Sequence, residues 1–416
     1  MRKLTVDPSE DPVTPDTLFA LQLRAAGEPL LPRLVAFKCK NANAAFIPFI
    51  PSFLCRKTVQ IGFHGFSIGT PTLMVTSMIV RLPALSPDLE HITLSPLPRD
   101  PSITEAVSEM LITCNRNTLQ WFRVDSPLTE EARGVAYQLP KLSELCTVVQ
   151  GRTLLPPVAL PNITVIDLEY GAHFDWLQGF RGQVLDNLDT IYFSSHSNQA
   201  GDFLGAFESV ALTTSIPTAL STFWYTTTRP WNPNYRPLLS FVQLNNLVVA
   251  FPCNEHCSSG VDDNLIVDLV RALPKLGILK LGGAPCGNPT GITAKGLIAL
   301  ACGCRHLSEL RIHFQTASLI QPVPAPGTLS PTEGEPVVRR QDCALTSLEV
   351  GETPIPAGAE WVVTIALLQI FPRLLEIGSR ARRWEVVLGN LRRFKQIGAF
   401  VHNTSEAHLP DLFLLK

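Results

Sequence analysis

The tightest group of metal-ligating side chains lies in the segment Cys253–Cys257, which also contains His256. Cys302, Cys304 and His306 form a second group further along the chain. Thiolates and imidazoles are the ligands of structural zinc sites. The spacing matches no common zinc finger, and the second group falls where a helix is expected to end against the core. We therefore expect no bound metal and no other cofactor.

The segment Gly65–Gly69 has the spelling Gly-x-Ser-x-Gly, with Ser67 in the position of a nucleophile. In α/β hydrolases this serine lies on a tight turn above a pocket, and a histidine and an acid complete the site. No such partners can be assigned in this chain. We expect no catalytic residues and no enzymatic activity, and hydrolase activity remains a remote alternative.

A third set of residues suits protein recognition. Trp121, Arg123, Asp167, Tyr192 and Trp224 each lie beside the central apolar residue of a short apolar phrase. Tryptophan, tyrosine and arginine are the residue types that dominate binding hot spots. We expect these five side chains to form a protein-binding patch. The alternative, that the rings only stack on their neighbours along a sheet, stays open.

The elements that must position these residues are short strands. A phrase of the form apolar-x-x-apolar-x-apolar recurs along the chain, most cleanly in Leu276–Leu281, Leu307–Ile312 and Leu345–Val350. Its first apolar positions are Leu34, Thr58, Leu89, Leu119, Leu142, Ile163, Leu188, Leu220, Leu244, Leu276, Leu307, Leu345 and Leu374. A repeat at intervals of this kind is the signature of a solenoid. The residues on either side of each second apolar position are expected to face outward.

Helical segments are expected between the phrases. Ser102–Glu105 has the form of a capping box that opens a helix over residues 106–112. Apolar residues at helical spacing predict further helices over 265–273 and 294–302. Strands that follow one another through helices form a parallel sheet with the helices on its other face. The expected fold class is α/β, a leucine-rich-repeat solenoid, or horseshoe, with a parallel inner sheet and outer helices.

A doubly wound α/β fold is the architectural alternative. It would need a glycine-rich phosphate-binding turn after a strand. Gly282–Gly287 comes nearest to such a turn, but Pro285 interrupts it. The sequence favours the solenoid.

The expected domain organisation has three parts. Residues 1–30 form an N-terminal lead-in with a capping helix, residues 31–400 form the solenoid, and residues 401–416 form a C-terminal tail. Proline and glycine are frequent at about 315–342, where few residues are apolar. We expect an irregular loop there.

Composition excludes several classes of function. The formal net charge is -2 and no dense run of lysine or arginine occurs, which argues against nucleic-acid binding. The longest apolar runs are about half of what a membrane-spanning helix needs, and the first residues do not resemble a secretory signal. The ten scattered cysteines fit a reducing compartment. We expect an intracellular monomer, in the cytoplasm or nucleus, that contacts no membrane.

Three segments carry a resemblance to a known family. Leu31–Leu34 begins the first repeat, Gly291–Leu310 holds a cysteine-containing repeat, and Phe371–Val387 closes the array. They resemble the leucine-rich-repeat part of the F-box proteins that are abundant in mushroom-forming fungi. The resemblance implies substrate recognition for an SCF-type ubiquitin ligase.

The chain departs from that family before its first repeat. Family members carry an F-box there, which docks a Skp1-type adaptor. Only about 30 residues precede Leu34, and they lack the family's Leu-Pro-rich three-helix opening. A Skp1-type adaptor is expected as a partner only if an F-box lies upstream of this chain. The rival hypothesis is a stand-alone interaction scaffold without a ligase role.

Overall fold

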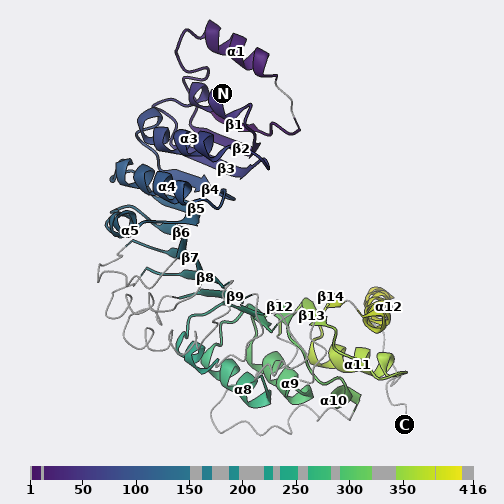
Figure 1. The fold of residues 1–416 in the computed structure, drawn as a ribbon. Helices are drawn as coiled ribbons and strands as arrows, with labels where there is room; N and C mark the ends of the chain where they lie inside the picture. The colour runs from purple at the N-terminus through teal and green to yellow at the C-terminus, as the bar shows by residue number, and fades with distance from the viewer. Residues whose placement is uncertain are drawn as a thin grey trace. The chain divides into compact units, whose positions relative to one another are not determined.

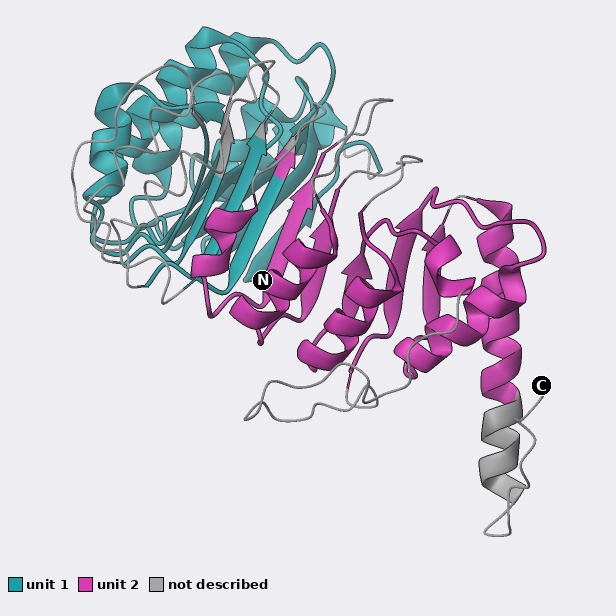
Figure 2. Ribbon diagram, turned by 90° about the horizontal axis from the view of Figure 1, so that it is seen from below, with its two compact units in different colours: residues 1–225 teal, residues 226–416 magenta. Residues whose placement is uncertain are grey.

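The computed structural model describes residues 2–10, 14–149, 162–170, 187–195, 220–227, 235–251, 261–282, 291–320, 343–379 and 381–404. Across these residues, fourteen strands form one parallel sheet, and each strand lies beside its neighbours in sequence (Figure 1). The chain divides into two compact units, residues 1–225 and residues 226–416 (Figure 2). We call them unit 1 and unit 2.

Unit 1 contains the first nine strands and the helices between them. Its elements are β1 (Lys3–Val6), α1 (Pro15–Arg24), β2 (Ala36–Ala42), η1 (Ile47–Phe49), α2 (Ile50–Phe53), β3 (Gln60–Phe66), α3 (Thr72–Leu85), β4 (His91–Leu94), α4 (Pro101–Thr113), β5 (Trp121–Pro127), α5 (Glu130–Tyr137), β6 (Glu144–Val149), β7 (Val165–Tyr170), β8 (Thr190–Ser195) and β9 (Thr222–Thr227). Strand β9 crosses into the first residues of unit 2.

Unit 2 repeats the same alternation. Its elements are η3 (Arg236–Ser240), β10 (Asn246–Ala250), α8 (Asp263–Ala272), β11 (Ile278–Leu281), α9 (Ala294–Gly303), β12 (Glu309–Arg311), α10 (Ala317–Ile320), β13 (Ser347–Gly351), α11 (Glu360–Ile370), β14 (Glu376–Ser379) and α12 (Arg382–Thr404). In each unit, helices cover one face of the strands, as α3 and α4 do in unit 1 and α8 and α9 in unit 2 (Figure 1).

The predicted strand positions are confirmed. Each strand from β2 to β14 begins two residues after the first apolar position of its phrase. The first and second positions of each phrase are buried, as Leu276 before β11 and Leu279 within it show. Side chains alternate between the two faces of a strand. The residues between the apolar positions are therefore directed away from the core.

A repeated backbone hydrogen-bond pattern fixes the register. The amides of Ser143 and Glu144 both donate to the carbonyl of Gln120, at 2.8 and 3.1 Å. The amides of Thr164 and Val165 share the carbonyl of Ser143 in the same way. The hydroxyl of Ser143 adds a third bond to Gln120 O at 3.0 Å. Equivalent positions of successive strands consequently lie side by side.

The N-cap of the helix before β5 lies two residues earlier than its capping motif predicts. Asp100, not Ser102, is the N-cap of α4, and its carboxylate accepts from the Ser102 amide at 2.9 Å. Pro101 follows at the first helical position, where a missing amide hydrogen costs nothing. The predicted capping box was therefore wrong in its position, although the helix is present.

Three elements lie where the sequence predicts a lead-in, an irregular loop or a tail. Strand β1 lies within the predicted lead-in and pairs with β2, so residues 3–6 belong to the sheet. Helix α10 occupies 317–320, inside the predicted irregular segment, of which 321–342 lies outside the described residues. Helix α12 continues to Thr404, beyond the predicted end of the repeats at residue 400. The remaining tail, 405–416, is also outside the described residues.

Among the residues that the structure describes, none forms a helix with the length and apolar character that a bilayer span requires.

Candidate functional site

All five predicted site residues lie at outward positions of unit 1. Trp121 and Arg123 are on β5, Asp167 on β7, Tyr192 on β8 and Trp224 on β9. We call the outward residues of β2 to β9, on the sheet face away from the helices, the outward stripe. The structure brings Arg123 to Asp167 and Tyr192 to Trp224.

Arg123 and Asp167 form an ion pair across an intervening strand. The register places Arg123, Cys146 and Asp167 side by side on β5, β6 and β7. The Arg123 Nη2 atom lies 3.3 Å from Asp167 Oδ2, and the Cys146 thiol donates to the same oxygen at 3.1 Å. Burial and the nearby Asp167 carboxylate raise the pKa of the Cys146 thiol. Cys146 is therefore a protonated donor and a poor nucleophile.

Glu144 is a buried carboxylate in the same part of the stripe. It is 8% exposed and lies beside Trp121 in the strand register. Burial raises its pKa to about 7; the Arg123 guanidinium opposes this shift and Asp167 adds to it. The side chain consequently changes charge near neutral pH.

Two rings at the β9 end of the stripe contact each other. The ring centroids of Tyr192 and Trp224 are 6.1 Å apart with an interplanar angle of 46°. Trp224 nevertheless remains 37% exposed, more than Trp121 on the same stripe. The rings thus pack on each other, as the stacking alternative expects, while Trp224 still presents apolar surface.

A cavity of about 550 Å³ opens on the stripe between β2 and β5. One row across these strands consists of Lys38, Gly62, Thr93 and Arg123, so two cations flank two small residues. None of the ten lining residues is acidic. We call this depression the cationic cavity.

The residues of the cationic cavity were only partly expected. Lys38 and His91 are outward residues of their phrases, yet their types alone did not mark them as a site. His64 on β3 and Ser95, directly after the end of β4, each lie one position beyond the third apolar residue of the phrase. The signal that could have found them is strand alternation continued past the third apolar residue.

The pKa of the His64 imidazole is sensitive to the positive charges around the cavity. Its pKa is lowered by burial and by the charges of Lys38, Lys40 and Arg123. Three separate cations therefore act on one point of the surface. This field favours an anion in the cavity.

The outward residues of unit 2 neutralise one another. Lys280 Nζ lies 2.7 Å from Glu309 Oε1, and Arg311 Nη2 lies 2.8 Å from Glu349 Oε1. Lys38 has no ion-pair partner among the described residues. Lys38 thus differs from Lys280 and Arg311 in that its charge is not paired with a carboxylate of the described chain.

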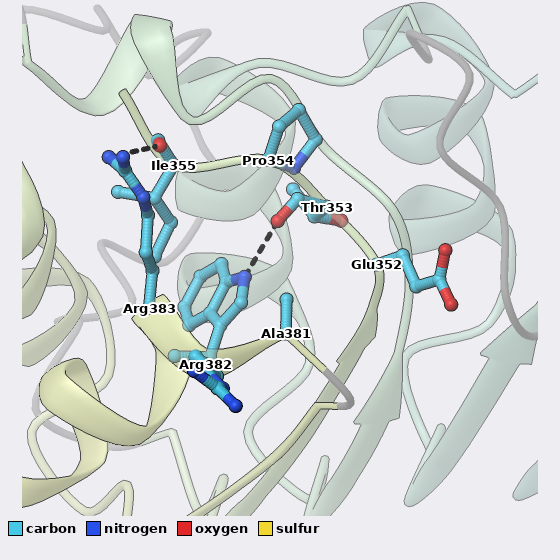
Figure 3. A pocket seen from close by; sticks show the side chains of 8 residues that line it. Glu352, Thr353, Pro354, Ile355, Ala381, Arg382 and Arg383 are labelled. Carbon is cyan, nitrogen blue, oxygen red and sulfur yellow. Dashed lines mark hydrogen bonds between the residues drawn. The ribbon is translucent and has the colours of Figure 1, made fainter. Parts of the chain in front are cut away.

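Unit 2 contains a second cavity, of about 560 Å³, between residues 352–355 and the start of α12 (Figure 3). The indole of Trp384 donates to the carbonyl of Thr353 at 2.7 Å, and Arg383 donates to the carbonyl of Ile355 at 3.2 Å. Arg383 also pairs with Glu360 at 3.5 Å. These bonds attach the first turn of α12 to the loop after β13.

The metal and nucleophile motifs gain no support. Cys253, His256 and Cys257 lie outside the described residues, and Cys304 is buried. No group of three metal-ligating side chains occurs within the described ranges. The Ser67 hydroxyl donates to the carbonyl of Asn41 at 3.2 Å. No described imidazole or carboxylate is hydrogen-bonded to it.

No protein-family model matches the chain, and no curated protein matches it.

Proposed function

We propose that the chain is a leucine-rich-repeat protein whose outward stripe in unit 1 binds another protein. The observation that carries the proposal is the composition of that stripe. Trp121, Arg123, Tyr192 and Trp224 follow one another across β5 to β9, among polar neighbours. Such aromatic and arginine side chains supply most of the energy of protein interfaces.

The extent of the stripe favours a protein over a small molecule. Lys38 on β2 and Trp224 on β9 are seven strand positions apart in the sheet order. Neighbouring strands lie about 4.8 Å apart, so the stripe runs about 34 Å along the sheet. A length of this kind matches one side of a standard protein interface.

Affinity capture with the full chain tests the proposal. Bait protein is immobilised in wild-type form, as the Trp121→Ala and Trp224→Ala double variant, and as Trp361→Ala. Trp361 lies on α11 and is 49% exposed, so it controls for loss of an exposed indole. We expect the double variant to lose partners that the other two retain. Identical partner sets for all three proteins would refute a binding role of the stripe.

The ligase role is a separate proposal that rests on the resemblance of the repeat segments. A substrate adaptor needs a docking segment for a Skp1-type protein in addition to a ligand-binding surface. Co-purification of the native protein with such an adaptor would support ligase membership. Its absence from a complex that still contains the stripe's partner would favour a stand-alone scaffold.

A further inference from the structure

The cationic cavity combines two features that a ligand can use. Lys38 and Arg123 flank it, and the intervening outward residues of that row are Gly62 and Thr93. Gly62 is buried and lacks a side chain, so its backbone forms the floor of the cavity and leaves the cavity volume open. A Cβ atom at this position would lie 3.1 Å from His64 Nε2 and 3.5 Å from Lys38 Cγ. A larger residue would therefore occupy the cavity itself.

The flanking cations retain unused hydrogen-bond donors. Lys38 is exposed and has no hydrogen-bond or ion-pair partner in the described part of the chain. The Arg123 side chain is 46% exposed and pairs with Asp167 through Nη2. A guanidinium carries five N–H donors, so most of its donors remain available to a second carboxylate.

One wall of the cavity is aromatic. The rings of His91 and Trp121 lie 6.1 Å apart at 50°. The Nε1 atom of Trp121 is buried and has no hydrogen-bond partner among the described residues. The wall offers apolar contact to the chain of a ligand and, after a small ring movement, a donor to its polar groups.

We propose that the cationic cavity receives aspartate or glutamate side chains from an acidic segment of the partner protein. The inference rests on the proposed function, since it names the chemistry of the partner at one part of the outward stripe. An anion is required because the lining holds two cations, two histidines and no acid. A peptide is favoured because the cavity shares Trp121 with the outward stripe that is proposed to bind a protein.

Asp167 limits the strength of this interaction. Its carboxylate pairs with Arg123 from the opposite side, and so competes with a bound carboxylate for the same guanidinium. Removal of the Asp167 charge should therefore strengthen the binding of an acidic ligand. If the cavity bound its ligand through shape alone, removal of the Asp167 charge would not strengthen binding.

A matched peptide array tests the ligand chemistry with the full chain. Each peptide that contains aspartate or glutamate is printed beside its asparagine or glutamine counterpart, a phosphoserine version and a lysine version. A single-stranded oligonucleotide is included as a separate anion. We expect binding to the acidic peptides above all other probes. Equal signals for the acidic and amide versions, or preference for phosphoserine or the oligonucleotide, would overturn the proposal.

Variants of the cavity then decide where the best acidic peptide binds. Lys38→Gln and Gly62→Val should each weaken its binding by about tenfold, the first by charge and the second by volume. Asp167→Asn should strengthen binding by about threefold. Lys295→Gln is the matched control, because Lys295 is an exposed cation on α9 of unit 2, outside the outward stripe and the cavity lining. We expect it to change binding by less than about twofold.

The outcome separates this inference from the proposed function. If Trp121→Ala and Trp224→Ala abolish partner capture while Lys38→Gln and Gly62→Val leave peptide binding unchanged, the stripe binds a protein but the cavity does not bind its carboxylates. If neither set has an effect, both proposals fail. Circular dichroism of each variant confirms that a loss of binding is not a loss of folding.

Discussion

At the residue scale, the outward stripe of unit 1 contains three chemically distinct parts. Lys38 and Arg123 make its β2 to β5 side cationic. Glu144 and Asp167 place acidic groups on β6 and β7. Tyr192 and Trp224 follow on β8 and β9. A partner that reads all three parts would be held in one direction along the sheet, because like charges oppose the reversed arrangement.

Glu144 makes the stability of the protein depend on pH. Its pKa is about 7 in the folded protein and 4.5 for the free side chain. The folded state therefore binds this proton more tightly than the unfolded state. The contribution to stability is complete below about pH 4.5 and is lost as the pH rises through 7.

The substitution Glu144→Gln should remove this loss of stability with rising pH. We expect the variant and wild type to unfold at equal urea concentrations near pH 4.5. At pH 8 the variant should be more stable by about 1 kcal/mol, since solvent screening and the Arg123 charge reduce the effect of burial. Urea unfolding over the pH series measures it. A difference that does not vary with pH would contradict the assigned cause.

At the element scale, the stability of unit 2 depends on the close approach of α8 and α9 and on the attachment of α12. Gly303 ends α9 where a Cβ atom would lie 1.9 Å from Val270 Cγ1 of α8. Trp384 anchors the first turn of α12 through its bond to Thr353 and packs edge-on against Phe314 at 6.1 Å. Both features involve contacts that no local pattern reveals.

Gly303→Ala should destabilise the protein by about 1–3 kcal/mol, because the added methyl group overlaps Val270. Val270→Ala in the same chain should recover part of the loss, which a double-mutant cycle in urea measures. Gly389→Ala on α12 is the matched control, since nothing lies within 4 Å of its Cβ position. It should stabilise the helix by about 0.5–1 kcal/mol. Equal effects at the two glycines would contradict the close approach.

Trp384→Phe should lower the free energy of unfolding by about 2 kcal/mol. The indole is 1% exposed, so the smaller ring leaves a void and an unpaired Thr353 carbonyl. The control Trp361→Phe keeps an exposed aromatic ring that stacks on Phe394. It should change stability by less than about 0.5 kcal/mol. A similar loss of stability in both variants would show that Trp384 contributes no more to folding than an exposed tryptophan does.

At the scale of the whole molecule, the repeats make stability local. Each strand pairs with its sequence neighbours, so a defect acts mainly on the adjacent repeats. Leu279 of β11 is fully buried. Leu279→Ala should cost about 2–5 kcal/mol locally.

Hydrogen exchange can show which strands lose stability in Leu279→Ala. In Leu279→Ala, amide protection should fall in β10 to β12 and remain unchanged in β2 to β6. Phe122→Ala, at the equivalent buried position of β5, is the matched variant and should give the reverse pattern. Equal loss of protection throughout the chain in either variant would show that the two units unfold as one.

The limits of sequence prediction follow from the same physics. The strands from β2 to β14 could be predicted because each phrase fixes its own alternation locally. Strand β1 was missed because its burial pattern is weak and it is held by pairing with β2. The pairing of Arg123 with Asp167 joins residues 44 positions apart and needed the strand register. The cationic cavity needed the absence of a side chain at Gly62, which no residue-type pattern marks as a site.

The measurement that tests the central claim most directly is the dissociation constant of a captured partner. It is determined for wild type, Trp224→Ala and Trp361→Ala, with folding checked by circular dichroism. Binding through the outward stripe predicts about tenfold weaker binding for Trp224→Ala and an unchanged constant for Trp361→Ala. Equal constants for wild type and Trp224→Ala, or a loss only in Trp361→Ala, would contradict the account.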